Sequence, residues 1–291
     1  MERDDYLAGR FEEHRDHLKA VAYRMLGSVS EAEDAVQETW LRLHRTDDER
    51  IENLGGWLTT VVARVALDML RARRDAPLEE GRLPEPVVEP ADALDPEHEA
   101  LLADSVGLAL LVVLETLSPA ERLAFVLHDM FSVPFSEIAA IAGRTPAASR
   151  QLASRARRRV RGSAPVPDPD LRRQRAVVDA YLAAARDGRF DDLVAVLDPE
   201  VVLRVDRGGE EGPLVVHGAQ HVARQALRGA PVGAVAHPAL INGGAGWLVT
   251  SDGAPIAVAA FTVADGRVVE LDILADRERL AQLDLSGFGV R

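Results

Sequence analysis

The sequence predicts a multidomain protein in which two all-α domains are followed by an α+β domain. Apolar residues recur at helical spacing up to about residue 162, which is typical of amphipathic helices. Two proline-rich stretches, at residues 75–99 and 163–169, lack this periodicity and predict a linker and a hinge. After residue 200, short apolar and β-branched runs end in glycine-containing turns, which predicts strands. A chain of 291 residues is long enough for two or three such domains.

The composition limits what the chain can be. It has no cysteine, which excludes disulfides and thiolate metal sites. No signal peptide or spanning helix is visible, so we expect a soluble, cytoplasmic protein without membrane contact. The net charge of −13 disfavours tight binding to free DNA. Arginines nevertheless cluster at residues 71–74 and 150–161, and these local basic surfaces indicate DNA binding that depends on a partner.

Capping patterns predict where two of the early helices begin. Ser30 followed by Glu33 predicts the start of the helix EAEDAVQETWLRLHR, and Ser118 followed by Glu121 predicts another. The first of these helices has an acidic outer face, which indicates either a protein partner with basic helices or an ordinary solvated surface. A further helix is predicted from about residue 56 to 74.

Residues 135–161, FSEIAAIAGRTPAASRQLASRARRRVR, predict a helix-turn-helix. The first helix ends at Gly143, and Thr145 with Pro146 supplies an N-cap followed by proline at the first position of a second helix. One face of that helix carries the apolar stripe Ala148, Leu152, Ala156 and Val160. Its other faces are rich in arginine and fit the DNA major groove, where Arg and Gln read base edges. An arginine-rich solvated helix in a bundle is the alternative.

Two of these stretches carry a family resemblance. SEAEDAVQETWLRLHR followed by NLGGWLTTVVARVALDMLRARR resembles domain two of bacterial extracytoplasmic-function sigma factors. SPAERLAFVLHDMFSVPFSEIAAIAGRTPAASRQLASRARRRV resembles their domain four. The resemblance implies an alternative sigma factor that binds core RNA polymerase and directs promoter-specific initiation, while the polymerase supplies the chemistry. It implies sigma domain 2 at residues 1–75, an acidic linker at 76–100 and sigma domain 4 at 101–162.

The same resemblance assigns roles to individual residues. The residues expected to bind core polymerase are Asp34, Gln37, Glu38 and Leu41. Those expected at the −10 element of promoter DNA are Asn53, Arg64, Arg71, Arg73 and Arg74. Those expected at the −35 element are Arg144, Thr145, Ser149, Arg150, Gln151, Ser154, Arg155, Arg158 and Arg159.

The last part of the chain, after a hinge at 163–170, predicts an α+β domain at 171–291. Helices are expected at 171–186 and around 190–197, followed by a curved antiparallel sheet. Asp265 and Gly266 predict a hairpin turn. The strands are expected at VVLRVD, PLVVHG, GWLVTSDG, IAVAAFTVADG and RVVELDILAD. FDDLVAVLDPEVVLRVD and HGAQHVARQAL resemble the SnoaL-like, NTF2-like fold, a cone-shaped α+β domain that often encloses a pocket.

Sigma factors with a fused SnoaL-like domain form a subgroup that this chain resembles. The resemblance implies that the domain regulates the protein in cis, through intramolecular contact with the sigma domains and a small-molecule ligand in its pocket. The motifs that carry it are Leu83, Pro84, Glu85 and Pro86 in the linker, and Asn242, Gly243 and Gly244 in the last domain. The proline motif is also consistent with a stiff spacer. The subgroup's closing motif has only a divergent counterpart at 276–280.

Two other classes of protein remain open from the sequence. One is a stand-alone helix-turn-helix regulator with a ligand-sensing domain, which would bind duplex DNA tightly without polymerase. The other is an enzyme of the SnoaL-like class, which needs a pair of titratable groups converging in the pocket. The candidates for such a pair are Asp206, His217, His221, His237 and Asp272. We expect no catalytic residue, cofactor or metal.

Overall fold

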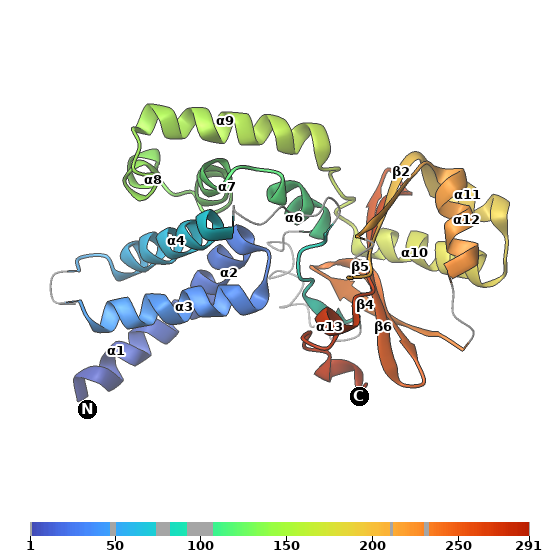
Figure 1. The fold of residues 1–291 in the computed structure, drawn as a ribbon, viewed down its shortest axis with the longest axis horizontal. Helices are drawn as coiled ribbons and strands as arrows, with labels where there is room; N and C mark the ends of the chain where they lie inside the picture. Colours follow the sequence, from blue (N-terminus) through green and yellow to red (C-terminus); the bar gives the residue numbers. More distant parts are fainter. Residues whose placement is uncertain are drawn as a thin grey trace. The chain divides into compact units, whose positions relative to one another are not determined.

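The computed structural model describes residues 2–46, 51–73, 82–91, 107–209, 212–229 and 233–290. The chain forms two compact units, which are described separately here (Figure 1). The helical unit comprises Met1–Pro77 and Val113–Ser163. The C-terminal unit comprises Leu78–Val112 and Ala164–Arg291, so the stretch expected to be a linker groups with the C-terminal domain.

The first half of the helical unit is built from four helices. They are α1 (Glu2–Glu12), α2 (Arg15–Leu26), α3 (Val29–His44) and α4 (Leu54–Ala72). Leu18, Met25, Leu43 and Leu58 are completely buried where α2, α3 and α4 pack. The cap of α3 is Ser28, whose hydroxyl accepts from the Glu31 amide; the expected cap at Ser30 was therefore two residues too late.

The second half of the helical unit contains the helix-turn-helix. Its elements are α7 (Pro119–Phe125), a π-helical turn (Val126–Met130), α8 (Phe135–Ala142) and α9 (Pro146–Ser163). The preceding helix, α6 (Leu108–Glu115), contains the sequence boundary between the two units. The expected capping box is present, because Ser118 accepts from the Glu121 amide and Glu121 accepts from the Ser118 amide. Gly143 ends α8 at a φ of 66°, a conformation that favours glycine.

Within the helical unit, α4 packs directly on α7 and α8. Arg122 of α7, only 2% exposed, donates to the Arg24 carbonyl oxygen at 3.2 Å and pairs with Glu115 at 2.9 Å. Arg64 of α4 donates to the carbonyl oxygen of Ala140 at 3.4 Å. The region predicted as domain two and the helix-turn-helix therefore form one packed body here.

The C-terminal unit is a seven-stranded sheet with helices packed on it. Its helices are α10 (Leu171–Arg186), α11 (Phe190–Val196), α12 (Ala219–Gly229) and α13 (Arg277–Leu280), with a 3₁₀ turn at Ser286–Phe288. Its strands are β1 (Val88–Pro90), β2 (Leu197–Asp206), β3 (Leu214–His217), β4 (Val235–Ile241), β5 (Gly244–Ser251), β6 (Ala254–Ala264) and β7 (Arg267–Leu274).

The sheet differs from expectation in two ways. Its order is β1-β4-β5-β6-β7-β2-β3, and β2 pairs in parallel with β7, so the sheet is mixed and not wholly antiparallel. Strand β1 comes from the stretch predicted as an extended linker, and it pairs antiparallel with β4. Strand β4 itself, VAHPALI, escaped prediction because its Pro238 is typical of an edge strand or a loop.

Three tight turns fix the register of the hairpins. Asp265 and Gly266 both have positive φ, as the sequence predicted for a type I′ hairpin. The same conformation occurs at Asp252 with its following glycine and at Asn242 with Gly243. The glycine-rich motif is therefore the β4–β5 hairpin.

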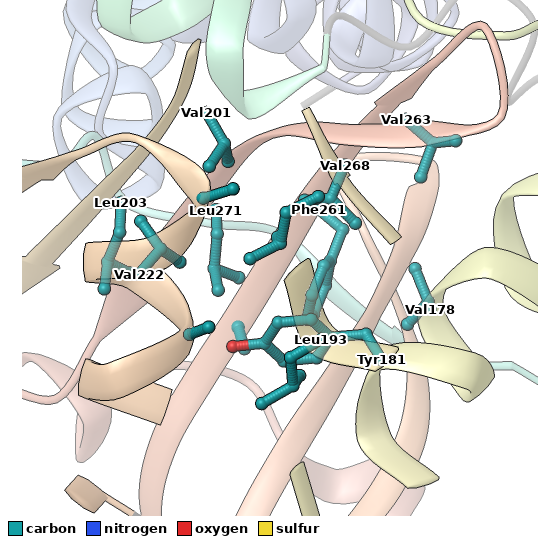
Figure 2. Close-up of a cluster of buried hydrophobic side chains, with 14 of the residues drawn as sticks. Val178, Tyr181, Leu193, Val201, Leu203, Val222, Phe261, Val263, Val268 and Leu271 are labelled. Atoms are coloured by element: carbon teal, nitrogen blue, oxygen red, sulfur yellow. The ribbon is translucent and has the colours of Figure 1, made fainter. Parts of the chain in front are cut away.

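The core of the C-terminal unit lies between the sheet and helices α10, α11 and α12 (Figure 2). Tyr181 of α10, Trp247 of β5 and Phe261 of β6 form an aromatic cluster, with ring centroids 4.7–6.1 Å apart. Leu203 and Leu271 contribute from the neighbouring strands β2 and β7. These side chains share one face of the sheet because residues alternate along each strand.

Candidate functional site

The recognition helix α9 presents a basic outer surface. Its exposed side chains include Arg150, Gln151, Ser154 and Arg158, and Arg144 is exposed in the turn before it. Thr145 caps the helix, since the Ala148 amide donates to its hydroxyl at 3.2 Å. This surface has the donors that the sequence predicted for the −35 element.

Three of the residues predicted for the −35 element have other contacts. Ser149 is completely buried and its hydroxyl donates to the Thr145 carbonyl oxygen at 3.2 Å, so its assignment to DNA is corrected. The buried stripe of α9 is Ser149, Leu152, Ala153 and Ala156, spaced at three and four residues, whereas Ala148 and Val160 are half-buried. Arg155 and Arg159 pair with Glu121 at 3.1 and 3.5 Å.

Glu121 connects α7 to α9 through ion pairs with Arg155 and Arg159. Burial would raise its pKa, but hydrogen bonds from Ser118 and the charges of Arg159 and Arg155 outweigh burial and hold the pKa below its usual range. The carboxylate thus stays charged at neutral pH and links the start of α7 to α9.

The outer face of α3 is open. Asp34 and Gln37 are exposed, and Leu41 is 41% exposed although it is aliphatic. Glu38 is half-buried and pairs with Arg42 at 2.8 Å. The four residues predicted to bind polymerase thus follow one face of a single helix, at spacings of three and four.

The residues predicted for the −10 element have varied environments. Asn53 is exposed and caps α4, accepting from the Gly56 amide at 3.0 Å. Arg64 and Arg71 are exposed, and Arg71 pairs with Asp68 at 3.4 Å. Arg73 is half-buried and held in the fold by an ion pair with Glu31 and a 3.0 Å hydrogen bond to the Leu26 carbonyl oxygen. Arg74 lies outside the described residues.

Residues 82–91, called the linker segment below, are bound along the C-terminal unit. Leu83, Pro84 and Pro86 are buried. The Val87 amide donates to the side-chain oxygen of Asn242 at 3.1 Å, and the Asn242 amide donates to the Val87 carbonyl oxygen at 2.9 Å. The structure thus brings together the proline motif and the glycine-rich motif, which are about 155 residues apart in the chain.

A buried ion pair holds the start of the linker segment. Asp206 at the end of β2 pairs with Arg279 of α13 at 2.5 Å and accepts from the Leu83 amide at 3.1 Å. Arg279 also donates to the Leu83 carbonyl oxygen at 2.7 Å. We call Asp206, Arg279 and Asn242 the linker clasp. No role for Arg279 was predicted from the sequence beyond its place in the divergent motif at 276–280.

The five candidates for an acid–base pair do not converge in the cavity of the C-terminal unit. His217 and His221 are exposed, and His237 hydrogen-bonds Thr250 at 2.9 Å. Asp206 belongs to the linker clasp. Asp272 pairs with Arg204 at 2.9 Å. Burial raises the pKa of Asp272 to about 6; the negative charge of Glu270 also raises it, while the positive charge of Arg204 lowers it. None of the five lines the cavity.

Among the residues that the structure describes, no group of three or more histidine, aspartate or glutamate side chains is arranged to hold a metal ion. No helix in this part of the chain has both the length and the apolar character needed to cross a bilayer.

Two stretches of the chain match models of known protein families. Residues 10–76 match the model of Sigma-70 region 2, and residues 107–160 match that of Sigma-70, region 4. The chain thus has the two-domain arrangement of a sigma factor. It is 40% identical over 290 residues to the ECF RNA polymerase sigma factor SigJ of Mycobacterium tuberculosis, covering 92% of this chain and 91% of the relative. The chain belongs to the ECF RNA polymerase sigma factors.

Two other comparisons agree. The probable ECF RNA polymerase sigma factor SigI of M. tuberculosis is 36% identical over 231 residues, which is 78% of each chain. The crystal structure of M. tuberculosis SigJ superposes with a TM-score of 0.76 at 38% identity, over 96% of this chain and 99% of that one. The expectation of two helical sigma domains followed by an α+β domain is confirmed, as is that of an alternative sigma factor for promoter-specific initiation.

Proposed function

We propose that the C-terminal unit regulates this sigma factor in cis by holding the linker segment on its sheet. The observation that carries the proposal is the linker clasp, in which side chains of the C-terminal unit hydrogen-bond the main chain of Leu83 and Val87. Strand β1 adds main-chain pairing with β4. A segment whose amides and carbonyls are used in this way is not available to follow a different path on the polymerase.

The strength of these contacts suits a reversible switch. Each hydrogen bond of this kind contributes about 0.5 to 1.5 kcal/mol net, and more where a charge takes part. Moving a two-state equilibrium from 1:99 to 99:1 requires about 5.5 kcal/mol. A few such bonds together therefore bias the linker segment towards the bound state without fixing it there permanently.

Asn242 offers a test that leaves the turn intact. Replacing Asn242 by glycine preserves the positive φ of the hairpin and removes the side-chain acceptor for the Val87 amide. We expect transcription from a cognate promoter with core polymerase to rise roughly twofold to tenfold, as the loss of one such bond allows. The matched control is Asp265→Gly, the same position in another hairpin, without a contact to the linker segment. Equal output from Asn242→Gly and the control would refute the proposal.

For the sigma domains, we propose that the open face of α3 binds core polymerase and that the exposed donors of α9 read the −35 element. The exposed Asn53, Arg64 and Arg71 are the −10 candidates that the structure leaves accessible. Arg73 contributes chiefly to holding α4 against α2 and α3 through its contacts with Leu26 and Glu31. The polymerase supplies the chemistry of initiation.

Two neighbouring residues of α9 test this assignment. Arg150→Ala is expected to reduce discrimination at the −35 element by about 1 to 3 kcal/mol, roughly 5- to 150-fold, because an exposed arginine reads a guanine edge with two hydrogen bonds. Ser149→Ala should leave that discrimination unchanged, because Ser149 faces the interior. Transcription from a library of −35 variants measures both. A loss of discrimination in Ser149→Ala with none in Arg150→Ala would overturn the orientation of the helix on DNA.

A further inference from the structure

The C-terminal unit contains a large cavity whose lining includes none of the three linker clasp residues. Its volume is about 1780 Å³, larger than the roughly 300 to 1,000 Å³ of most small-molecule sites. Tyr181, Trp247 and Phe261 form its aromatic wall, and Leu203, Val249 and Ile273 contribute aliphatic surface. Figure 2 shows Tyr181, Phe261 and Leu203 among the buried side chains of the core.

One polar group in this apolar wall, the hydroxyl of Tyr181, has no hydrogen-bond partner among the described residues. Tyr181 is only 6% exposed, and its hydroxyl forms no hydrogen bond with any described residue. Burial raises the pKa of this hydroxyl, so it remains a neutral donor. A ligand oxygen in the cavity would satisfy it, and this points to a ligand that carries an acceptor.

The mouth of the cavity is positively charged. Arg186 of α10, Arg207 after β2 and Arg277 of α13 line it, and none of the three pairs with an acid among the described residues. Asp252 and Asp284 line the same region, which leaves an excess of one positive charge. Unpaired guanidinium groups beside an apolar cavity complement a ligand that has an apolar body and an anionic group.

The cavity and the linker clasp share two elements. Arg277 and Leu280 of α13 line the cavity, while Arg279 of the same helix holds Leu83. On β2, Val205 lines the cavity and the next residue, Asp206, faces the linker segment. Because α13 is only four residues long, a displacement of its backbone towards an anion at Arg277 also carries Arg279. Such a displacement changes the contacts of Arg279 with Asp206 and with the Leu83 carbonyl oxygen.

We propose that this cavity binds an apolar small molecule bearing one anionic group, and that occupancy loosens the linker clasp through α13. The first part stands on the cavity, the unpaired Tyr181 hydroxyl and the arginines of the mouth. The second part rests on the regulation proposed above. The ligand shifts the linker segment only as far as its affinities for the held and released forms differ.

Two fluorescent probes of the same ring system test the binding site on the full chain. 1-Anilinonaphthalene-8-sulfonate is apolar and anionic, and N-phenyl-1-naphthylamine is its uncharged counterpart. We expect one molecule of the anionic probe to bind per chain, at least tenfold more tightly than the neutral one. Ala257→Trp, which places an indole ring among the residues that line the cavity, should weaken both at least tenfold, and Ala183→Trp on the exposed side of α10 should weaken neither.

A second variant keeps the test decisive if Ala257→Trp fails to fold. Arg186→Gln combined with Arg207→Gln alters only exposed side chains of the mouth. It should reduce the preference for the anionic probe, with Arg277 still in place, and leave the neutral probe bound as before. Unchanged preference in this variant, or unchanged binding in a folded Ala257→Trp, would overturn the cavity as an anionic-ligand site.

Amide hydrogen exchange tests the effect of the ligand on the linker segment separately from ligand binding itself. The amides of Leu83 and Val87 donate to Asp206 and Asn242 and are therefore protected. Saturation with the anionic probe should speed their exchange at least tenfold, while amides between β6 and β7 stay unchanged. Binding without faster exchange would overturn the coupling alone. Faster exchange without a change in transcription would contradict the proposed regulation and leave the site standing.

Discussion

Replacing Asp206 by alanine is expected to release the linker segment and raise promoter-specific transcription at least tenfold. The carboxylate accepts from the Leu83 amide at 3.1 Å and orients Arg279, which holds the Leu83 carbonyl oxygen at 2.7 Å. One substitution therefore removes both main-chain contacts at the start of the linker segment. A tenfold change corresponds to about 1.4 kcal/mol, which is less than two such bonds contribute when a charge takes part. In vitro transcription with purified core polymerase measures the effect.

The same substitution is expected to lower the free energy of unfolding of the C-terminal unit by roughly 3 to 5 kcal/mol, because Arg279 stays buried without its carboxylate. The double variant Asp206→Ala/Arg279→Met removes the unpaired charge and should recover much of the melting temperature, with transcription still high. If transcription in the double variant returned to the wild-type level, unfolding and not linker release would explain the single variant. Asp198→Ala, on the same strand without a linker contact, is the control.

Local patterns in the sequence predicted most of the helices and hairpins. The helix at 171–186 has the bounds that were expected, and the capping box at Ser118 and Glu121 is present in full. These features depend on side chains within a few residues of the backbone they bind. The stripe of α9 was drawn at a strict four-residue spacing, whereas a helix turns every 3.6 residues, and this error placed Ser149 on the DNA face.

The linker clasp could not be predicted in the same way. The hydrogen bonds of Leu83 connect it to residues that lie 123 and 196 positions further along the chain. Local periodicity in the sequence does not predict such a contact. Asp206 looked like a catalytic candidate because an isolated acid in a strand has no visible partner in the sequence. Strand β1 was hidden because it is only three residues long and lies among prolines that are typical of a linker.

Substitutions on the exposed face of α3 are expected to have a similarly large effect on binding to core polymerase. The double variant Asp34→Arg/Leu41→Ser should weaken binding to core polymerase at least 100-fold. Leu41 is an aliphatic side chain left 41% exposed on an acidic helix face, and burying it in an interface contributes on the order of 1 kcal/mol. Reversing the charge of Asp34 opposes a basic partner surface and costs several kcal/mol more. Titration of labelled protein with purified core polymerase measures the affinity.

Both altered side chains are on the outside of α3, so the melting temperature of the helical unit should change little. The matched control is Glu200→Arg/Val215→Ser, which makes the same chemical changes at an exposed acid and a 37% exposed aliphatic residue of the C-terminal unit. The charge contribution should also shrink as salt is raised, because exposed charges are screened. Equal affinities for the α3 variant and its control, with both proteins folded, would show that polymerase binds another surface of the chain.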